Sequence, residues 1–178
     1  MLSALLGLWI SLLPTEADAA DFKPPEILKA FGQTLMLNGC ASRDILWIDL
    51  YDLALYLPSS NDKVDATAPD RQAKTFWIKV TYDGSIPKGI PSEQWKEILK
   101  SDLSQKVLDR LGVVIGKLKQ GDIVQVQAAP GQGDRLYLNG QLEFDESHAD
   151  LSKALTTLWL GPNPVSKNMR RLLLLGHC

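Results

Sequence analysis

Cysteine and histidine are scarce in this sequence. Among 178 residues there are two cysteines, Cys40 and Cys178, and two histidines, His148 and His177. Zinc sites take three or four such ligands at short, recognisable spacings, and no such spacing occurs here. Neither histidine belongs to a recognisable nucleophile motif, so no Ser-His-Asp or Cys-His arrangement is predicted. The sequence therefore predicts no metal site, no cofactor and no hydrolytic triad.

An excess of charge of one sign is also missing. The chain has 19 basic and 21 acidic residues, a formal net charge of −2. Nucleic-acid-binding domains usually carry a basic excess, and polybasic segments attract anionic membranes. We therefore expect no nucleic-acid partner and no polybasic attachment to a membrane. A hydrophobic content of 45% over this length is typical of one globular domain with a core of useful size.

The N-terminus contains a short apolar run, residues 1–13, which is below the roughly 20 residues that a membrane-spanning helix needs. Pro14 and the small-x-small pattern Ala17-Asp18-Ala19 follow it, although no lysine or arginine precedes it. We interpret residues 1–19 as a secretory signal peptide and residues 20–178 as a single domain. The domain is then periplasmic or otherwise exported, and no membrane span remains after signal removal.

Export would place the two cysteines in an oxidising compartment. Cys40 follows a predicted strand, and Cys178 is the last residue. The sequence does not show whether they lie close enough for a disulfide, so this pairing stays open. Because chain ends often fray, we favour two unpaired cysteines.

Apolar–polar alternation predicts strands, and apolar residues three and four positions apart predict helices. The predicted strands cover 33–38, 46–57, 75–82, 122–128, 135–138 and 141–144. The predicted helices are one of about five turns over 92–111, a short one over 112–119, one over 151–160 and one over 166–175. The run 46–57 is apolar on both faces, so both are covered or one lines a cavity. Strand runs separate from helix runs, which predicts an α+β fold with a mostly antiparallel sheet covered on one face by helices.

One segment places an arginine beside these apolar strands: Leu37-Asn38-Gly39-Cys40-Ala41-Ser42-Arg43, followed by the run from Tyr51 to Leu57. Together with Asn139-Gly140 and Leu158-Trp159-Leu160-Gly161-Pro162, it resembles the chalcone isomerase-like family, in its bacterial exported branch. The resemblance implies an open-faced β-sandwich, in which a large antiparallel sheet and a layer of helices enclose a ligand cleft.

The resemblance also implies two different activities. Plant chalcone isomerases close a chalcone to a flavanone, whereas non-catalytic relatives bind fatty acids through an arginine that holds the carboxylate. Arg43 matches that arginine, but Tyr51 stands where the plant enzymes have a catalytic threonine. We therefore expect no flavanone-forming activity and name no catalytic residue. Arg43, Tyr51, Tyr82 and Trp95 are the candidate ligand-binding residues.

Three hypotheses follow for the function. In the first, Arg43 holds a small amphipathic anion, a fatty acid or other carboxylate. In the second, the chain is an isomerase or intramolecular lyase that acts on an enolate-forming substrate, and Arg43 stabilises the oxyanion. In the third, only the fold is used, for a protein partner, and Arg43 is neutralised by Asp49 or Asp52. Trp159 is expected in the core, and Tyr51 is either an ordinary strand aromatic or a hydroxyl that serves Arg43 or the ligand.

Overall fold

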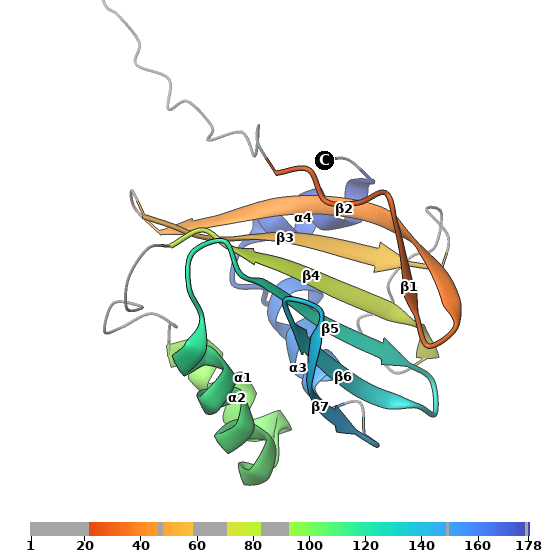
Figure 1. Ribbon diagram of the computed structural model, residues 1–178. Coiled ribbons are helices and arrows are strands. Elements are labelled where there is room, and N and C mark those ends of the chain that lie inside the picture. The colour runs from red at the N-terminus through yellow and green to blue at the C-terminus, as the bar shows by residue number, and fades with distance from the viewer. Residues whose placement is uncertain (1–21, 46–47, 59–70, 83–92, 149, 177) are drawn as a thin grey trace, which may run out of the picture.

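The computed structural model describes residues 22–45, 48–58, 71–82, 93–148, 150–176 and 178. Its strands form one seven-stranded antiparallel sheet in which each strand pairs with the next in chain order (Figure 1). These strands are β1 Ile27–Ala30, β2 Gln33–Ile45, β3 Ile48–Leu57, β4 Lys74–Val80, β5 Ile123–Ala129, β6 Gly133–Leu138 and β7 Gln141–Glu146. The helices are α1 Glu93–Asp102, α2 Gln105–Lys117, α3 Asp150–Leu160 and α4 Lys167–Leu175. The predicted α+β class with an antiparallel sheet is confirmed.

The helices differ from the prediction between β4 and β5. Where the sequence predicts one long helix and a short second one, the chain forms α1 and α2, which meet at Leu103 and Ser104. The Ser104 hydroxyl accepts a hydrogen bond from the Val107 backbone N–H, so Ser104 is the N-cap of α2. Leu103 and Val107 are both buried in the same core. Apolar spacing therefore continues across the break, which is why periodicity alone does not reveal it.

Each face of the sheet is covered by a separate apolar core. Leu53 and Leu55 of β3 belong to a helix-side core, which they share with Phe76 and with buried residues of α2, α3 and α4. The alternate residues Ala54 and Tyr56 belong to an outer-face core. In Figure 1, α3 and α4 lie behind the sheet. Both faces of β3 are thus covered, one of the two outcomes that its apolar pattern allowed.

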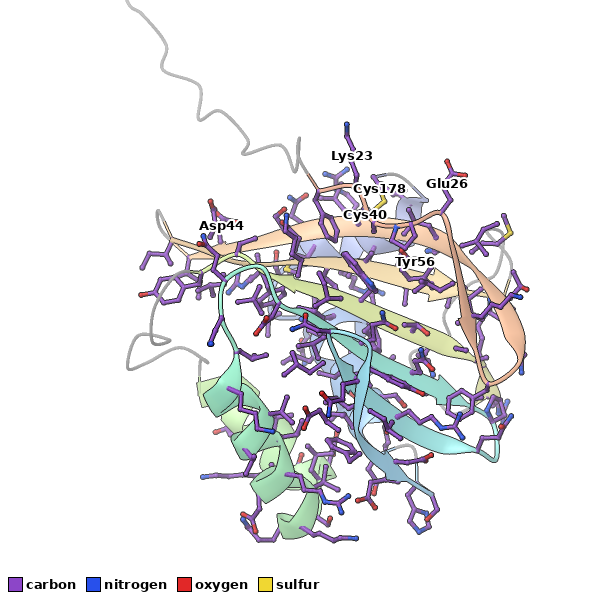
Figure 2. The ribbon with its side chains drawn as sticks, in the orientation of Figure 1. Lys23, Glu26, Cys40, Asp44, Tyr56 and Cys178 are labelled. Carbon is purple, nitrogen blue, oxygen red and sulfur yellow. A yellow bond between two sulfur atoms is a disulfide. The ribbon has the colours of Figure 1, made fainter. Side chains whose placement is uncertain are left out.

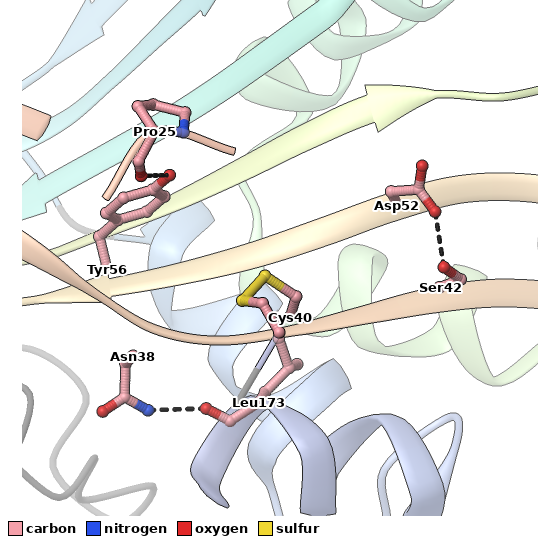
Figure 3. The surroundings of a disulfide bond; sticks show 8 residues. Pro25, Asn38, Cys40, Ser42, Asp52, Tyr56 and Leu173 are labelled. Carbon is pink, nitrogen blue, oxygen red and sulfur yellow. Dashed lines mark hydrogen bonds between the residues drawn. A yellow bond between two sulfur atoms is a disulfide. The ribbon is translucent and has the colours of Figure 1, made fainter. Parts of the chain in front are cut away.

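Residues 22–26, which we call the N-terminal arm, cover the outer face of the sheet. The Phe22 ring lies 5.5 Å from that of Trp77, measured between centroids. The Tyr56 hydroxyl donates a 2.6 Å hydrogen bond to the Pro25 carbonyl (Figure 3). The arm therefore packs on the sheet and leads into β1.

The C-terminus returns to β2, which corrects the prediction of unpaired cysteines. Helix α4 packs against β2, where the Asn38 side-chain amide donates a 2.7 Å hydrogen bond to the Leu173 carbonyl. Gly176 ends the helix in the left-handed conformation, and the last residue, Cys178, forms a disulfide with Cys40 (Figures 2 and 3). The Cα atoms of the two cysteines are 4.8 Å apart. The chain end was expected to fray, but α4 packs on the sheet and brings Cys178 to Cys40 of β2.

A buried carboxylate fixes the start of α3. Asp134 of β6 is 1% exposed, and its Oδ2 accepts a 2.9 Å hydrogen bond from the Ser152 backbone N–H. No described group donates to its Oδ1. Burial raises the pKa of Asp134 to about 6, against the hydrogen bonds from Ser152 and Leu151 that lower it. Ionising this carboxyl therefore costs more in the folded than in the unfolded chain.

We expect the substitution Asp134→Asn to change how stability depends on pH. Because the folded pKa lies above the unfolded value, the contribution of Asp134 to stability is full below about pH 4 and is lost as the pH rises through about 6. The loss amounts to roughly 2–3 kcal/mol. Urea unfolding of both proteins between pH 4 and 7 measures it, and the difference between them isolates Asp134 from other carboxylates. Parallel stability curves for the two proteins would contradict the assignment.

Candidate functional site

Arg43 and Tyr51 lie opposite each other on neighbouring strands. They are register partners of β2 and β3, close to the hairpin end, where the register shifts between Arg43 and Asp44. Directly opposed residues of an antiparallel pair project from the same face. Tyr51 packs against the helix-side core, so Arg43 also emerges on the helix face. The structure thus places both candidates at one end of the helix-side core.

Arg43 has no counter-ion in the described structure. It is half-buried, and it makes no salt bridge or side-chain hydrogen bond with any residue that the structure describes. Asp52 lies on the outer face, where its carboxylate accepts a 2.6 Å hydrogen bond from the Ser42 hydroxyl (Figure 3). Asp49 is exposed and pairs in register with Asp44. Neutralisation of Arg43 by Asp49 or Asp52, as the third hypothesis required, is not found.

The Tyr51 hydroxyl has a partner that sequence reasoning missed. The indole Nε1–H of Trp159, in α3, donates a 2.9 Å hydrogen bond to it. Trp159 is 1% exposed, and its ring packs edge-to-face on Phe76 with centroids 5.0 Å apart. The prediction that Trp159 is a core residue is confirmed. Its second role was hidden because the two residues are 108 positions apart.

Tyr51 remains a neutral phenol at physiological pH. Burial raises its pKa to about 12, while the hydrogen bond from Trp159 and the positive charge of Arg43 act in the opposite direction. Within the described ranges, no residue accepts the hydrogen of this hydroxyl. Arg43 and Tyr51 therefore offer hydrogen-bond donors, side by side, at the border of an apolar core.

The other two candidates are placed less completely. Tyr82 is half-buried and follows β4, whose last residue, Val80, is the register partner of Tyr51. The Tyr82 backbone N–H donates to the carbonyl of Leu50, the residue before Tyr51. Trp95 is part of α1, but its side chain lies outside the described part of the structure. The structure therefore brings Tyr82 to the same end of the sheet as Arg43 and leaves Trp95 as a prediction.

Helices α1 and α2 border an apolar hollow of about 580 Å³. Its lining consists of Leu99, Lys100, Leu103, Gln105 and Leu108. Leu99 and Leu108 also pack against the helix-side core, so the hollow adjoins the same apolar layer as Tyr51. Of the candidates whose side chains the structure describes, Arg43, Tyr51 and Tyr82 do not line it.

Two further classes of site lack support in the described residues. No cluster there of three or more histidine, cysteine or acidic side chains has the arrangement of a metal site. None of the helices described combines the length and the apolar character that crossing a membrane requires.

Comparison with known protein families shows to which family the chain belongs. A family model described as chalcone isomerase-like matches residues 16–176. The chain belongs to the chalcone isomerase-like family. The resemblance inferred from the motif around Arg43 is thereby confirmed at the level of the family. No curated protein sequence matches the chain significantly.

A solved structure shows the same fold. The crystal structure of a fatty-acid binding protein from Arabidopsis thaliana, AtFAP1, is similar to this chain with a TM-score of 0.61 and 15% sequence identity. The similarity covers 86% of this chain and 91% of that one. At this identity the comparison establishes the fold, an open-faced antiparallel sheet with helices on one face, for this member of the family.

Proposed function

We propose that this chalcone isomerase-like chain binds a small amphipathic anion, a fatty acid or a similar carboxylate, through Arg43 and without flavanone-forming activity. The observation that carries the proposal is the guanidinium of Arg43, which faces the helix side of the sheet without a described counter-ion. A half-buried, unpaired charge costs solvation free energy. A carboxylate would offset that cost with two parallel hydrogen bonds to the planar guanidinium.

Three further features support a ligand of this class. The Tyr51 hydroxyl lies beside Arg43 and offers a second donor for the head group. The helix-side core adjoins both residues and offers apolar side chains against which the chain of such a ligand would pack. AtFAP1, which has the same fold, is named as a fatty-acid binding protein. We propose Tyr82 and Trp95 as residues that line the remainder of the site.

The isomerase alternative receives less support from the site. Reaction through an enolate needs a group that takes up a proton from the substrate. The described candidates, Arg43 and Tyr51, are both donors, and Tyr51 holds its own proton to about pH 12. Binding therefore accounts for the described groups better than proton transfer does.

Substitution of Arg43 by glutamine should weaken the binding of dodecanoate by about 10- to 100-fold, since hydrogen bonds to charged groups contribute about 1.5–3 kcal/mol. Isothermal titration calorimetry on delipidated protein measures the affinity. The matched control is Arg71→Gln, because Arg71 is exposed and precedes β4, whereas Tyr51 pairs with Val80 at the other end of that strand. Equal affinities for the wild type and Arg43→Gln would refute the proposal.

We also propose that the chain is an exported, bacterial-type member of the family, with residues 1–19 as the signal peptide and the periplasm or another compartment outside the cytoplasm as its destination. The small-x-small pattern at Ala17-Asp18-Ala19 supports cleavage before Ala20. The Cys40–Cys178 disulfide supports an oxidising compartment. Intact mass spectrometry of protein from the cell envelope tests the cleavage and the disulfide together. We expect the mass of a chain that begins at Ala20, lower by two hydrogens than that of the reduced chain. Retention of residues 1–19 would contradict it.

A further inference from the structure

We propose that Trp159 is a positioning residue that makes the head-group site selective for ionised carboxylates, because it fixes the Tyr51 hydroxyl as a hydrogen-bond donor to the ligand. This inference rests on the proposed function. It adds a residue of α3 to Arg43 and Tyr51, the two strand residues that would hold the head group, and it defines which head groups they accept.

The direction of the hydrogen bond between Trp159 and Tyr51 follows from chemistry alone. An indole Nε1–H can only donate, whereas a phenol oxygen both donates one hydrogen and accepts. In the 2.9 Å contact Trp159 must therefore be the donor and the Tyr51 oxygen the acceptor. The hydroxyl hydrogen has to point away from the indole.

Arg43 cannot take this hydrogen either. A guanidinium has five N–H donors and no acceptor. Since no other residue in the described structure accepts from Tyr51, both neighbours of the phenol leave its hydrogen available. The two described residues of the head-group site consequently present donors to the ligand: the guanidinium N–H groups of Arg43 and the O–H of Tyr51.

Trp159 is held firmly enough to enforce this orientation. Its indole is 1% exposed and rests edge-to-face on Phe76. The helix that carries it ends at Leu160, whose carbonyl accepts a 2.9 Å hydrogen bond from the Arg170 guanidinium Nε of α4. A rigid donor therefore meets the Tyr51 oxygen from a fixed direction.

A site with only donors favours a head group with only acceptors. An ionised carboxylate has two acceptor oxygens and no hydrogen to place, so it satisfies both Arg43 and Tyr51. An alcohol of the same chain length brings a hydrogen that finds no acceptor among these residues. Sites built to pair a particular polar group discriminate strongly against analogues that leave groups unpaired. The expected ligand class is thus the ionised fatty carboxylate rather than the corresponding alcohol.

The substitution Trp159→Phe keeps an aromatic ring but removes the N–H. The Tyr51 hydroxyl can then turn and accept from the ligand, so we expect the preference for dodecanoate over dodecanol to fall by about 3- to 10-fold, the equivalent of one hydrogen bond. Calorimetric titration with both compounds gives the ratio. Trp77→Phe is the matched control, because Trp77 packs on Phe22 at the outer face and should leave the ratio unchanged.

A second background separates positioning from a merely structural role. In a Tyr51→Phe protein the hydroxyl is absent, so adding Trp159→Phe should no longer change the ratio. If Trp159 had only a structural role, Trp159→Phe would weaken the binding of dodecanoate and dodecanol equally, and it would do so in the Tyr51→Phe protein as well. That result would overturn the inference. If Trp159→Phe does not fold, Tyr51→Phe alone is used for the test. It should also lower the ratio of the affinity for dodecanoate to that for dodecanol. An unchanged ratio would overturn the inference.

The outcomes for Trp159 and for the proposed function are distinguishable. Tight binding of dodecanoate that is lost in Arg43→Gln, together with an unchanged ratio in Trp159→Phe, would overturn only the role of Trp159. Failure of the wild-type protein to bind dodecanoate would overturn the proposed function and with it this inference. A ratio that falls in Trp159→Phe but not in the control supports both.

Discussion

Replacing Cys178 with serine should lower the free energy of unfolding by about 2–5 kcal/mol, the usual effect of losing a native disulfide. The Cys40–Cys178 bond joins residues 138 positions apart, and cross-links that close long loops restrict the unfolded chain most. Urea unfolding under non-reducing conditions measures the difference. The matched control is the same measurement with reductant. Reductant should lower the free energy of unfolding of the wild type to that of Cys178→Ser and should leave the value for the variant unchanged.

The loss should be located in α4. This helix reaches β2 through the hydrogen bond from Asn38 to Leu173 and through the buried side chains of Met169 and Leu173. Without the disulfide, hydrogen exchange should accelerate first in Lys167–Leu175, because local openings occur where few contacts hold an element. Equal unfolding midpoints for the wild type and Cys178→Ser, with unchanged exchange in α4, would contradict this role for the bond.

Substitution of Gly39 by alanine should destabilise the protein by about 2–4 kcal/mol, through overpacking and the loss of a buried hydrogen bond. A Cβ at this position would lie 2.5 and 2.6 Å from the carbonyl oxygens of Leu172 and Leu173. These are backbone atoms of α4, so the helix itself must shift, and the 2.7 Å hydrogen bond from Asn38 is then lost.

Gly112→Ala provides the matched control for Gly39→Ala. Gly112 lies within α2, is exposed, and has no atom within 4 Å of the position that an added Cβ would occupy. Alanine there should stabilise the protein by about 0.5–1 kcal/mol, because glycine loses more conformational freedom in a helix. Thermal unfolding of the two variants gives the comparison. A Gly39→Ala protein as stable as the wild type would show that α4 does not press on β2 at this position.

The elements found from the sequence are those with strong local signals. Asn139 and Gly140, a dipeptide typical of hairpin turns, connect β6 to β7 with φ angles of 51° and 81°. Ser166 and Gly176 cap α4 at the predicted ends, since its N-cap hydroxyl and its left-handed glycine act within a few residues. Such features depend on neighbours in the chain and are readable without a structure.

Strand β1 was missed because its turn has an unusual residue. Phe31 and Gly32 connect β1 to β2 with φ angles of 51° and 72°. Glycine favours such a turn, but phenylalanine rarely adopts a positive φ, so only half of the usual hairpin signal is present in the sequence. The arm that precedes β1 then supplies the cover for the outer face, which explains the second apolar face of β3.

The site was predictable only in part for a similar reason. The motif that ends in Arg43 pointed to an arginine at the edge of an apolar layer, and the strand register set Tyr51 beside it. The partners of these residues come from distant parts of the chain, as Trp159 does for Tyr51. Neither the indole donor nor the lack of a described counter-ion for Arg43 could be derived before the sheet and α3 were placed together.

The central claim is that Arg43 pairs with the carboxylate of an amphipathic ligand. Its most direct test is the titration of dodecanoate labelled with ¹³C at the carboxyl carbon, observed by NMR while bound to the protein. An opposite charge favours the ionised form, so the pKa of the bound carboxyl should lie below that of the free acid, and Arg43→Gln should raise it. A bound carboxyl whose pKa is unaffected by Arg43→Gln, or a label that does not bind, would contradict the account.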